Sequence, residues 1–208
     1  MIGAYVTCLK CYDDWYLKDE PPFGRQQWPD RFRRGLKLWF YESNAQVAPY
    51  PTFASNTLDG NEPRIMLWGA WYEGATGFLY WQINQWTLKD PWGPNIEYGV
   101  TGDGVLVYPG HHDGLLKGVG SPPEVSLDGP IPSMRLKQIR NALQDWTLFT
   151  LASDKGKGDY ARSQIAQIYS QLGGCSWRGC GPINGRFYWQ SDEARMQEIR
   201  RNIARAIN

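Results

Sequence analysis

Residues 74–86 read Gly-Ala-Thr-Gly-Phe-Leu-Tyr-Trp-Gln-Ile-Asn-Gln-Trp. Positions 76–81 are rich in β-branched, aliphatic and aromatic residues, which predicts a short buried strand. Amides and indoles follow where that strand would end, at Gln82, Asn84, Gln85 and Trp86. Flat rings cover the apolar faces of a sugar and amides bind its hydroxyls, so a carbohydrate site is one interpretation. A core strand with a Trp-rich end explains the same residues equally well.

Strands and helices are expected to alternate around this stretch. We expect strands at residues 4–11, 36–41 and 76–81, and helices at 62–73, 134–151, 160–172 and 192–207, with Ser133 and Ser191 as N-caps. A long Gly- and Pro-rich loop, residues 87–132, holds one strand-like island at 104–108 within a single domain of residues 1–208. This order predicts parallel α/β units. A full (β/α)₈ barrel needs roughly 250 residues, so the expected fold class is α/β, the C-terminal portion of an incomplete TIM-like barrel.

Composition argues against several classes of partner. The net charge of the 208 residues is +1, which gives no electrostatic reason to expect nucleic acid or an anionic membrane. No apolar run is long enough to span a bilayer, and the first residues lack the features of a signal peptide. The 11 Trp and 12 Tyr exceed what a core of this size needs, which favours sugar stacking.

The cysteines and histidines give weak signals for a metal. Cys8 and Cys11 are spaced differently from Cys175 and Cys180, so a zinc site is poorly supported. Free thiols are expected for the first pair, and a thiol pair or a local disulfide for the second. The adjacent His111 and His112 fit a solvated turn better than a ligand cluster. No metal and no cofactor are expected.

An ordered series of blocks resembles the catalytic domain of glycoside hydrolase family 123. The blocks are residues 35–41, Tyr50-Pro51, Arg64-Ile65, Trp68, residues 71–81, Asn84, Trp86, residues 90–92, 102–110 and 132–136, continuing to Arg140 and Asp145. Each block alone is weak, but their order is specific and spans most of residues 35–151. The segment 114–128 resembles an insertion.

The resemblance implies a (β/α)₈ barrel that cleaves terminal β-linked N-acetylgalactosamine, in a secreted or periplasmic parent protein. It implies a substrate-assisted mechanism, in which the acetamido oxygen of the sugar attacks the anomeric carbon. An adjacent Asp-Glu pair orients the acetamido group and supplies the general acid/base. We expect one cleft at the strand ends, lined by Tyr41, Tyr80, Trp81, Asn84 and Trp86 and bordered by Asp103 and Tyr108.

Asp19 and Glu20, followed by Pro21, are the candidate catalytic pair in this chain. Only residues 22–34 separate them from Gly35, which leaves no room for the helix and strand that the family places there. We therefore interpret the pair as a coincidence in a polar loop, with the true pair before residue 1. The chain would then be a truncated, split or divergent product that is inactive alone.

Three other hypotheses stay open at this point. The chain could be a compact glycosidase that uses Asp19 and Glu20, or a non-catalytic carbohydrate-binding or interaction protein. A metal-binding redox protein is the weakest of the three. The expected partner is an amino-sugar glycoside. An incomplete barrel would expose strand edges and helix faces, so self-association or pairing with a missing N-terminal part is also expected.

Overall fold

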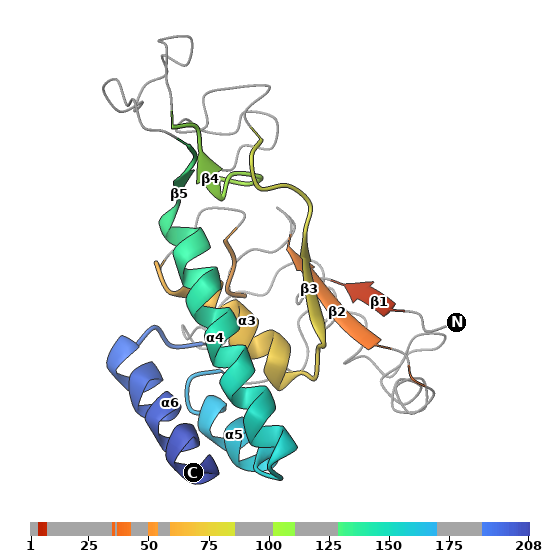
Figure 1. Ribbon diagram of the computed structural model, residues 1–208, viewed down its shortest axis with the longest axis vertical. Coiled ribbons are helices and arrows are strands. Elements are labelled where there is room, and N and C mark those ends of the chain that lie inside the picture. Colours follow the sequence, from red (N-terminus) through yellow and green to blue (C-terminus); the bar gives the residue numbers. More distant parts are fainter. Residues whose placement is uncertain are drawn as a thin grey trace, which may run out of the picture.

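A three-stranded parallel sheet and a layer of helices make up the main body of the computed structural model (Figure 1). The structure describes residues 4–7, 35, 37–42, 50–53, 59–85, 102–110, 129–169 and 189–208. The strands are β1 (Ala4–Thr7), β2 (Lys37–Glu42) and β3 (Gly77–Tyr80), in the order β1-β2-β3. Both strand pairs are parallel. The predicted parallel α/β arrangement is therefore confirmed here, while residues 8–11 of the first predicted strand lie outside the described part.

Burial alternates along β2, which distinguishes a buried face of the sheet from a more exposed one. Leu38, Phe40 and Glu42 are buried, and the residues between them are more exposed. In register, Phe40 lies beside Phe78 and Glu42 beside Tyr80. Paired positions on neighbouring strands share a face, so the buried face of the sheet carries all of these side chains.

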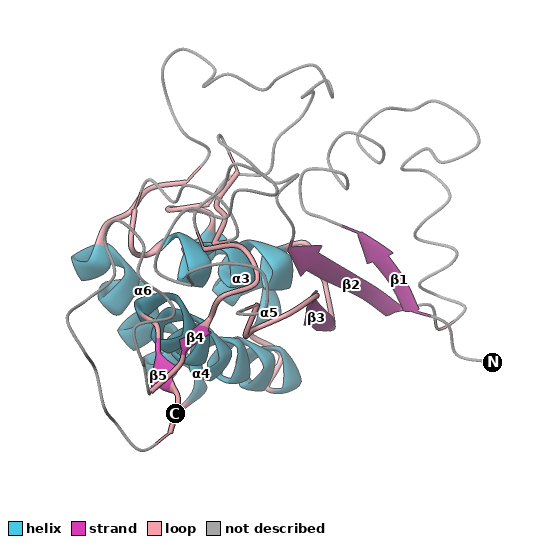
Figure 2. Cartoon of the chain, turned by 90° about the horizontal axis from the view of Figure 1, so that it is seen from above, coloured by secondary structure: helices cyan, strands magenta, loops and turns pink. Residues whose placement is uncertain are grey.

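Helix α3 (Glu62–Tyr72) lies between the sheet and the other helices (Figures 1 and 2). Pro63 stands in its first turn, where the missing N–H costs nothing. Every residue from Glu62 to Trp71 is buried. Most of its apolar side chains join Leu38, Phe40, Phe149, Ile165 and Ile199 in one core, while Met66 and Leu67 belong to a second cluster with Phe53.

Three further helices pack beside α3. They are α4 (Met134–Asp154), α5 (Gly158–Ile165) and α6 (Glu193–Ile207). Helix α4 ends at Asp154, three residues beyond the predicted end at residue 151. The second begins before residue 160 and ends at Ile165 instead of 172, because the chain turns and Tyr169 pairs with Trp189. All the helices lie on one side of the sheet in both views (Figures 1 and 2).

Side-chain caps begin two of these helices. Ser133 Oγ accepts the N–H of Leu136 at 3.1 Å, as predicted for α4. The cap predicted for the last helix was wrong by one residue, because Asp192 accepts the N–H of Arg195 at 3.0 Å. Ser191 instead donates its hydroxyl to Asp59.

A small antiparallel sheet stands at the N-terminal end of α4 (Figure 1). It pairs β4 (Val107–Tyr108) with β5 (Ile131–Pro132). The predicted island at 104–108 is a strand only at its last two residues, and β5 was not predicted. No helix in the described part of the chain is long and apolar enough to cross a membrane.

Candidate functional site

Asp103 is the centre of a buried hydrogen-bond cluster just beyond the end of β3. Its side chain is 2% exposed. One oxygen, Oδ1, accepts both the hydroxyl of Tyr80 and the indole N–H of Trp81, each at 2.9 Å. Consecutive strand residues point to opposite faces. The chain bends at Trp81, directly after β3, and this bend is where two neighbouring side chains converge on one carboxylate.

Two glycines hold the turn that carries Asp103. Gly102 and Gly104 have φ of 94° and 74°, a region that L side chains rarely adopt. A Cβ on Gly102 would lie 1.6 Å from Nη1 of Arg135, and one on Gly104 would lie 2.9 Å from the ring of Trp81. Both positions therefore require glycine for conformation and for space, so the position of Asp103 is tightly determined.

Backbone pairing fixes the segment after β3 against this turn. The N–H of Gln85 donates to the carbonyl of Gly104, and that of Leu106 to Ile83, each at 2.8 Å. Asn84 forms an isolated antiparallel bridge with Val105. The exposed side chain of Asn84 therefore belongs to a segment that is bonded to the Asp103 turn.

Arg135, in the first turn of α4, ties three parts of the chain together. Its Nη2 donates to the carbonyl of Val105 at 2.8 Å, and its Nη1 donates to the carbonyl of Phe53 at 3.3 Å. A longer contact of 3.5 Å joins Nη2 to the hydroxyl of Tyr108. Through Arg135 the structure connects Tyr108 to the glycine-flanked turn.

Tyr80 is a neutral donor in this cluster. Burial raises the pKa of its hydroxyl, and the neighbouring charge of Asp103 raises it further. The N–H of Gly104 donates to the same hydroxyl oxygen at 2.5 Å. The ring packs edge-on against Phe53, with 4.8 Å between centroids. Tyr80 is therefore a structural member of the site, because its hydroxyl both donates a hydrogen bond to Asp103 and accepts one from Gly104.

Trp81 has a different position. Its residue surface is 46% exposed even though its N–H is bonded to buried Asp103. The polar edge of the indole is thereby anchored, while a large apolar surface remains open to solvent. An anchored aromatic ring of this kind can stack on the apolar face of a ligand such as a sugar.

The other predicted site residues are not all in this cluster. Tyr41 lies beside Leu79 in the register, on the sheet face opposite to Tyr80. Leu79 is 44% exposed on that face. Asp19, Glu20 and Trp86 lie outside the described residues. The structure thus brings together Tyr80, Trp81 and Asp103, with Asn84 and Tyr108 attached through the backbone and Arg135.

Two charged residues near the site were not predicted. Glu42 ends β2 and is 1% exposed; its Oε1 accepts the hydroxyl of Thr52 and, at 3.4 Å, the N–H of Phe53. The alternation Leu38, Phe40, Glu42 was the available signal, since it places a carboxylate on the buried face. For Arg135 the signal was a cation in a helix's first turn, where the helix dipole disfavours positive charge.

The described residues contain no group of three His, Cys, Asp or Glu side chains that could hold a metal ion. The four cysteines and both histidines lie outside this part of the chain. The alternatives drawn from their spacing therefore stay predictions.

A comparison with family models identifies one family, and a comparison with solved structures finds a similar fold. The family model for the glycoside hydrolase 123 catalytic domain matches residues 13–152. The structure of a family 123 glycoside hydrolase from Clostridium perfringens, reported in connection with glycolipid glycan hydrolysis, superposes with a TM-score of 0.58 at 17% sequence identity. That match covers 86% of this chain and 29% of the other, so this chain spans under a third of its length. The search of curated proteins finds no match.

Proposed function

The chain belongs to the glycoside hydrolase 123 family, and on that premise we propose that it binds terminal β-linked N-acetylgalactosamine at Trp81. In this proposal the chain supplies part of a carbohydrate site for glycoside hydrolysis. The three parallel strands would be a section of a (β/α)₈ barrel, with Trp81 beyond the C-terminal end of β3. That is the end at which such barrels bind their substrates.

The observation that carries this proposal is the anchored and half-exposed ring of Trp81. Because the indole N–H is bonded to Asp103, little side-chain freedom is left to lose when a ligand stacks on the ring. Asp103 is itself held by the glycine-flanked turn and by Tyr80. A pre-ordered apolar ring, with the exposed Asn84 on the segment bonded to the Asp103 turn, supplies the mixture of surfaces that an amino sugar needs.

We propose that catalysis at a complete site, with a general acid in place, follows the substrate-assisted route. The acetamido oxygen of the sugar would attack the anomeric carbon, while a carboxylic acid protonates the leaving oxygen. Asp103 supports this chemistry only indirectly, because its Oδ1 is occupied by two donors. Glu42 accepts hydrogen bonds from Thr52 and Phe53. Within the described residues of the site, both carboxylates thus have structural partners.

We therefore propose that the isolated chain does not hydrolyse N-acetylgalactosaminides at a useful rate. Loss of a positioned general acid typically removes a factor of about 10²–10⁴ from the rate. The second candidate function, non-catalytic carbohydrate binding, is favoured by the same pattern: Asp103 is used to orient Trp81, and the ring itself stays open.

The proposal is tested by assaying turnover and binding with the same protein. Turnover of a chromogenic aryl N-acetyl-β-galactosaminide is measured for the wild type and, in parallel, for Glu20→Gln. Binding of N-acetylgalactosamine is measured by NMR titration of the indole signals, beside Trp81→Ala. Tyr160→Ala is the matched control, because Tyr160 is an exposed aromatic on α5, outside the site.

We expect no turnover, with binding that Trp81→Ala abolishes and Tyr160→Ala retains. Turnover that disappears in Glu20→Gln would instead support a compact enzyme that uses Asp19 and Glu20. Absence of any binding would contradict the carbohydrate proposal itself. We further propose self-association through open apolar surface such as that of Leu79, and a monodisperse monomer in light scattering would contradict this.

A further inference from the structure

A second polar site lies in the helical layer, and it is built around Asp145. This α4 carboxylate is wholly buried. Its Oδ2 accepts Nε of Arg64 at 2.7 Å and the indole N–H of Trp68 at 2.8 Å. Its Oδ1 lies 2.5 Å from Nε of Arg200 on α6. Two guanidinium groups therefore share one carboxylate.

The contact between Asp145 and Arg200 is an ion pair whose geometry is not that of a hydrogen bond. Neither Asp145 Oδ1 nor Arg200 Nε has a hydrogen-bond partner among the described residues, although the two atoms are close. Nη1 of Arg200 donates to the amide oxygen of Gln197 at 3.1 Å. No hydrogen bond from Nη2 of Arg200 is present within the described part of the chain, and the side chain is about a third exposed, so this edge of the guanidinium is open to a ligand.

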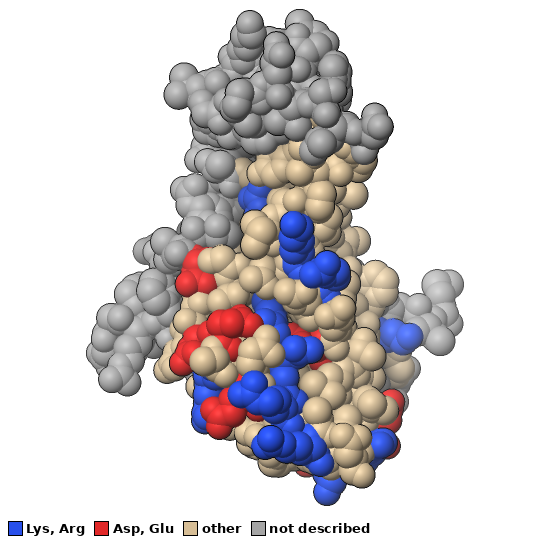
Figure 3. Space-filling view, turned by 60° about the vertical axis from the view of Figure 1, so that its left-hand side comes forward, with Lys and Arg blue, Asp and Glu red and all other residues tan. Residues whose placement is uncertain are grey.

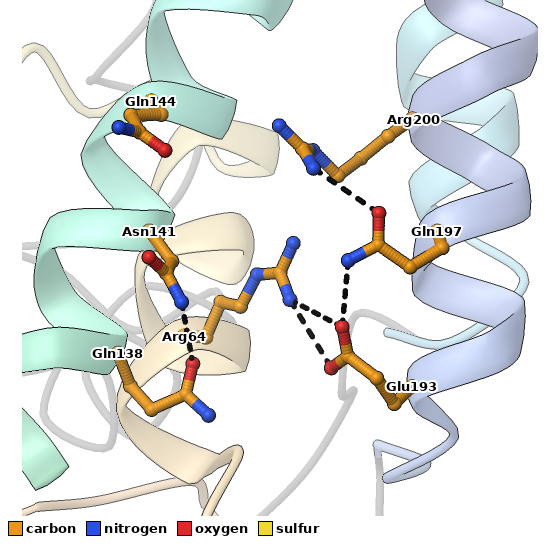
Figure 4. Close-up of a pocket in the computed structure, with 7 residues that line it drawn as sticks. All are labelled: Arg64, Gln138, Asn141, Gln144, Glu193, Gln197 and Arg200. Carbon is orange, nitrogen blue, oxygen red and sulfur yellow. Dashed lines mark hydrogen bonds and ion pairs between the residues drawn. The ribbon is translucent and has the colours of Figure 1, made fainter.

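One edge of the Arg64 guanidinium, at Nη2, faces the space next to Arg200. Arg64 is 3% exposed, and its Nη1 donates to both oxygens of Glu193 at 2.9 and 3.1 Å. Its Nε donates to Asp145. No hydrogen bond from its Nη2 is present within the described part of the chain. In the close-up this nitrogen points across the pocket toward Arg200 (Figure 4). Arg64 Nη2 therefore presents its donor hydrogens to the pocket, where an acceptor from outside can bind.

The space beside these two arginines is a pocket of about 210 Å³. Arg64 forms its floor, and amides form its walls: Gln138, Asn141 and Gln144 from α4, and Gln197 from α6 (Figure 4). One water has a share of about 30 Å³ in the liquid, so the pocket accommodates a small organic molecule. Amide side chains both donate and accept, which suits hydroxyl groups.

The balance of charge limits what this molecule can be. Two arginines, Arg64 and Arg200, face two carboxylates, Asp145 and Glu193, so the site is close to neutral and disfavours a dianion more strongly than a monoanion. Two guanidinium edges match the planar geometry of a carboxylate. The face that carries α6 shows acidic and basic residues interspersed over it (Figure 3).

We propose that this pocket binds a small hydroxylated monocarboxylate, such as a sugar acid. The carboxylate lies between the free guanidinium edges of Arg64 and Arg200, and the hydroxyls meet the amides of Gln144 and Asn141. The pocket shares no residue with the cluster of Tyr80, Trp81 and Asp103. It is therefore a ligand site separate from the one proposed above.

The test uses D-galacturonate as the probe and D-galactose as its neutral counterpart. Calorimetric titration of the full chain is expected to show galacturonate binding in wild type and, unchanged, in Trp81→Ala, which separates this site from the first. Arg200→Gln is expected to weaken binding about tenfold or more, since it removes a charged donor. Arg201→Gln is the matched control: it removes the same charge from the next, exposed residue of α6 and is expected to leave the affinity unchanged.

If Arg200→Gln fails to fold, Gln144→Leu provides the alternative, because Gln144 is exposed at the pocket wall. We expect it to weaken binding several-fold. The proposal is overturned if galacturonate does not bind, or if Arg201→Gln weakens binding as much as Arg200→Gln. Equal binding of galactose, or of inorganic phosphate, would also overturn it, because the carboxylate would then not be what the pocket recognises.

Discussion

Trp81 donates its indole N–H to Asp103 across 2.9 Å, so that a residue with 46% of its surface exposed is held by a carboxylate that is 2% exposed. The exposed part of the indole is free for a ligand, while the bonded edge determines its orientation. This relationship joins stability to binding, because any change that releases Asp103 also releases the ring.

Asp103→Ala is expected to reduce both stability and sugar binding. Two hydrogen bonds to a charged group disappear, and the donors of Tyr80 and Trp81 lose their acceptor. The free energy of unfolding should fall by about 2–4 kcal/mol. Urea unfolding measures the loss, and NMR titration with N-acetylgalactosamine measures the affinity. Asp159→Ala, at an exposed position of α5, should leave both unchanged; an equal loss there would contradict the prediction.

Gly104→Ala is expected to cost more stability than Gly156→Ala. The two glycines have nearly the same φ, 74° and 72°, so the conformational cost of a Cβ, about 1–2 kcal/mol, is shared. Only at Gly104 would the new atom meet the Trp81 ring, at 2.9 Å, whereas nothing lies within 4 Å at Gly156. Urea unfolding of the two variants compares the losses. Only Gly104→Ala should also weaken sugar binding, and identical behaviour of both variants would argue against an anchored ring.

Tyr80 is expected to make the protein less stable in alkali. Burial, followed by the charge of Asp103, raises the pKa of its hydroxyl above the ordinary value of 10.0. The folded state therefore keeps a proton that the unfolded chain loses, so stability is full below pH 10.0 and decreases as pH rises above it. One such group contributes a slope of at most about 1.4 kcal/mol per pH unit.

Tyr80→Phe should remove this contribution. Unfolding free energies measured from about pH 9 to about pH 11 should fall more steeply in wild type than in Tyr80→Phe. Tyr160→Phe, at an exposed position, should retain the wild-type slope. Parallel curves for wild type and Tyr80→Phe would show that the hydroxyl is not protected as described.

Asp145→Ala is expected to destabilise the helical layer strongly. The change leaves Arg64 buried without its principal acceptor and removes the carboxylate next to Arg200. Breaking a buried ion pair in this way costs about 3–5 kcal/mol. Asp154→Ala, at the exposed end of the same helix, is the matched control for thermal and urea unfolding. If Asp145→Ala is as stable as Asp154→Ala, the carboxylate is not the link between the helices.

Local patterns predicted most of the regular structure. The apolar runs gave the three strands, and helical spacing with cap residues gave the positions of α3, α4 and α6. Parallel pairing followed from the alternation of strand and helix. The pairing of β4 with β5 did not, because two-residue strands have no period to detect. Ser191 and Asp192 are both good N-caps, so sequence alone could not choose between them.

The candidate site was predicted less completely, for a physical reason. Tyr80, Trp81 and Asp103 were proposed, but their common hydrogen bonds depend on a bend after β3 that strand periodicity does not contain. The placement of Tyr41 required the register with Leu79, which only the structure provides. Arg135 acts through backbone carbonyls, and such contacts have no signature in the residues that provide them.

Because α3 is enclosed, hydrogen exchange in this helix measures the global unfolding of the domain. Every residue from Glu62 to Trp71 is buried between the sheet and the other helices. Its amide hydrogens can meet solvent only when these layers separate, so their exchange with deuterium follows global unfolding and not local fraying. Mass spectrometry of a peptide from this helix would therefore report the opening free energy of the entire layer assembly, with no probe attached and no residue changed.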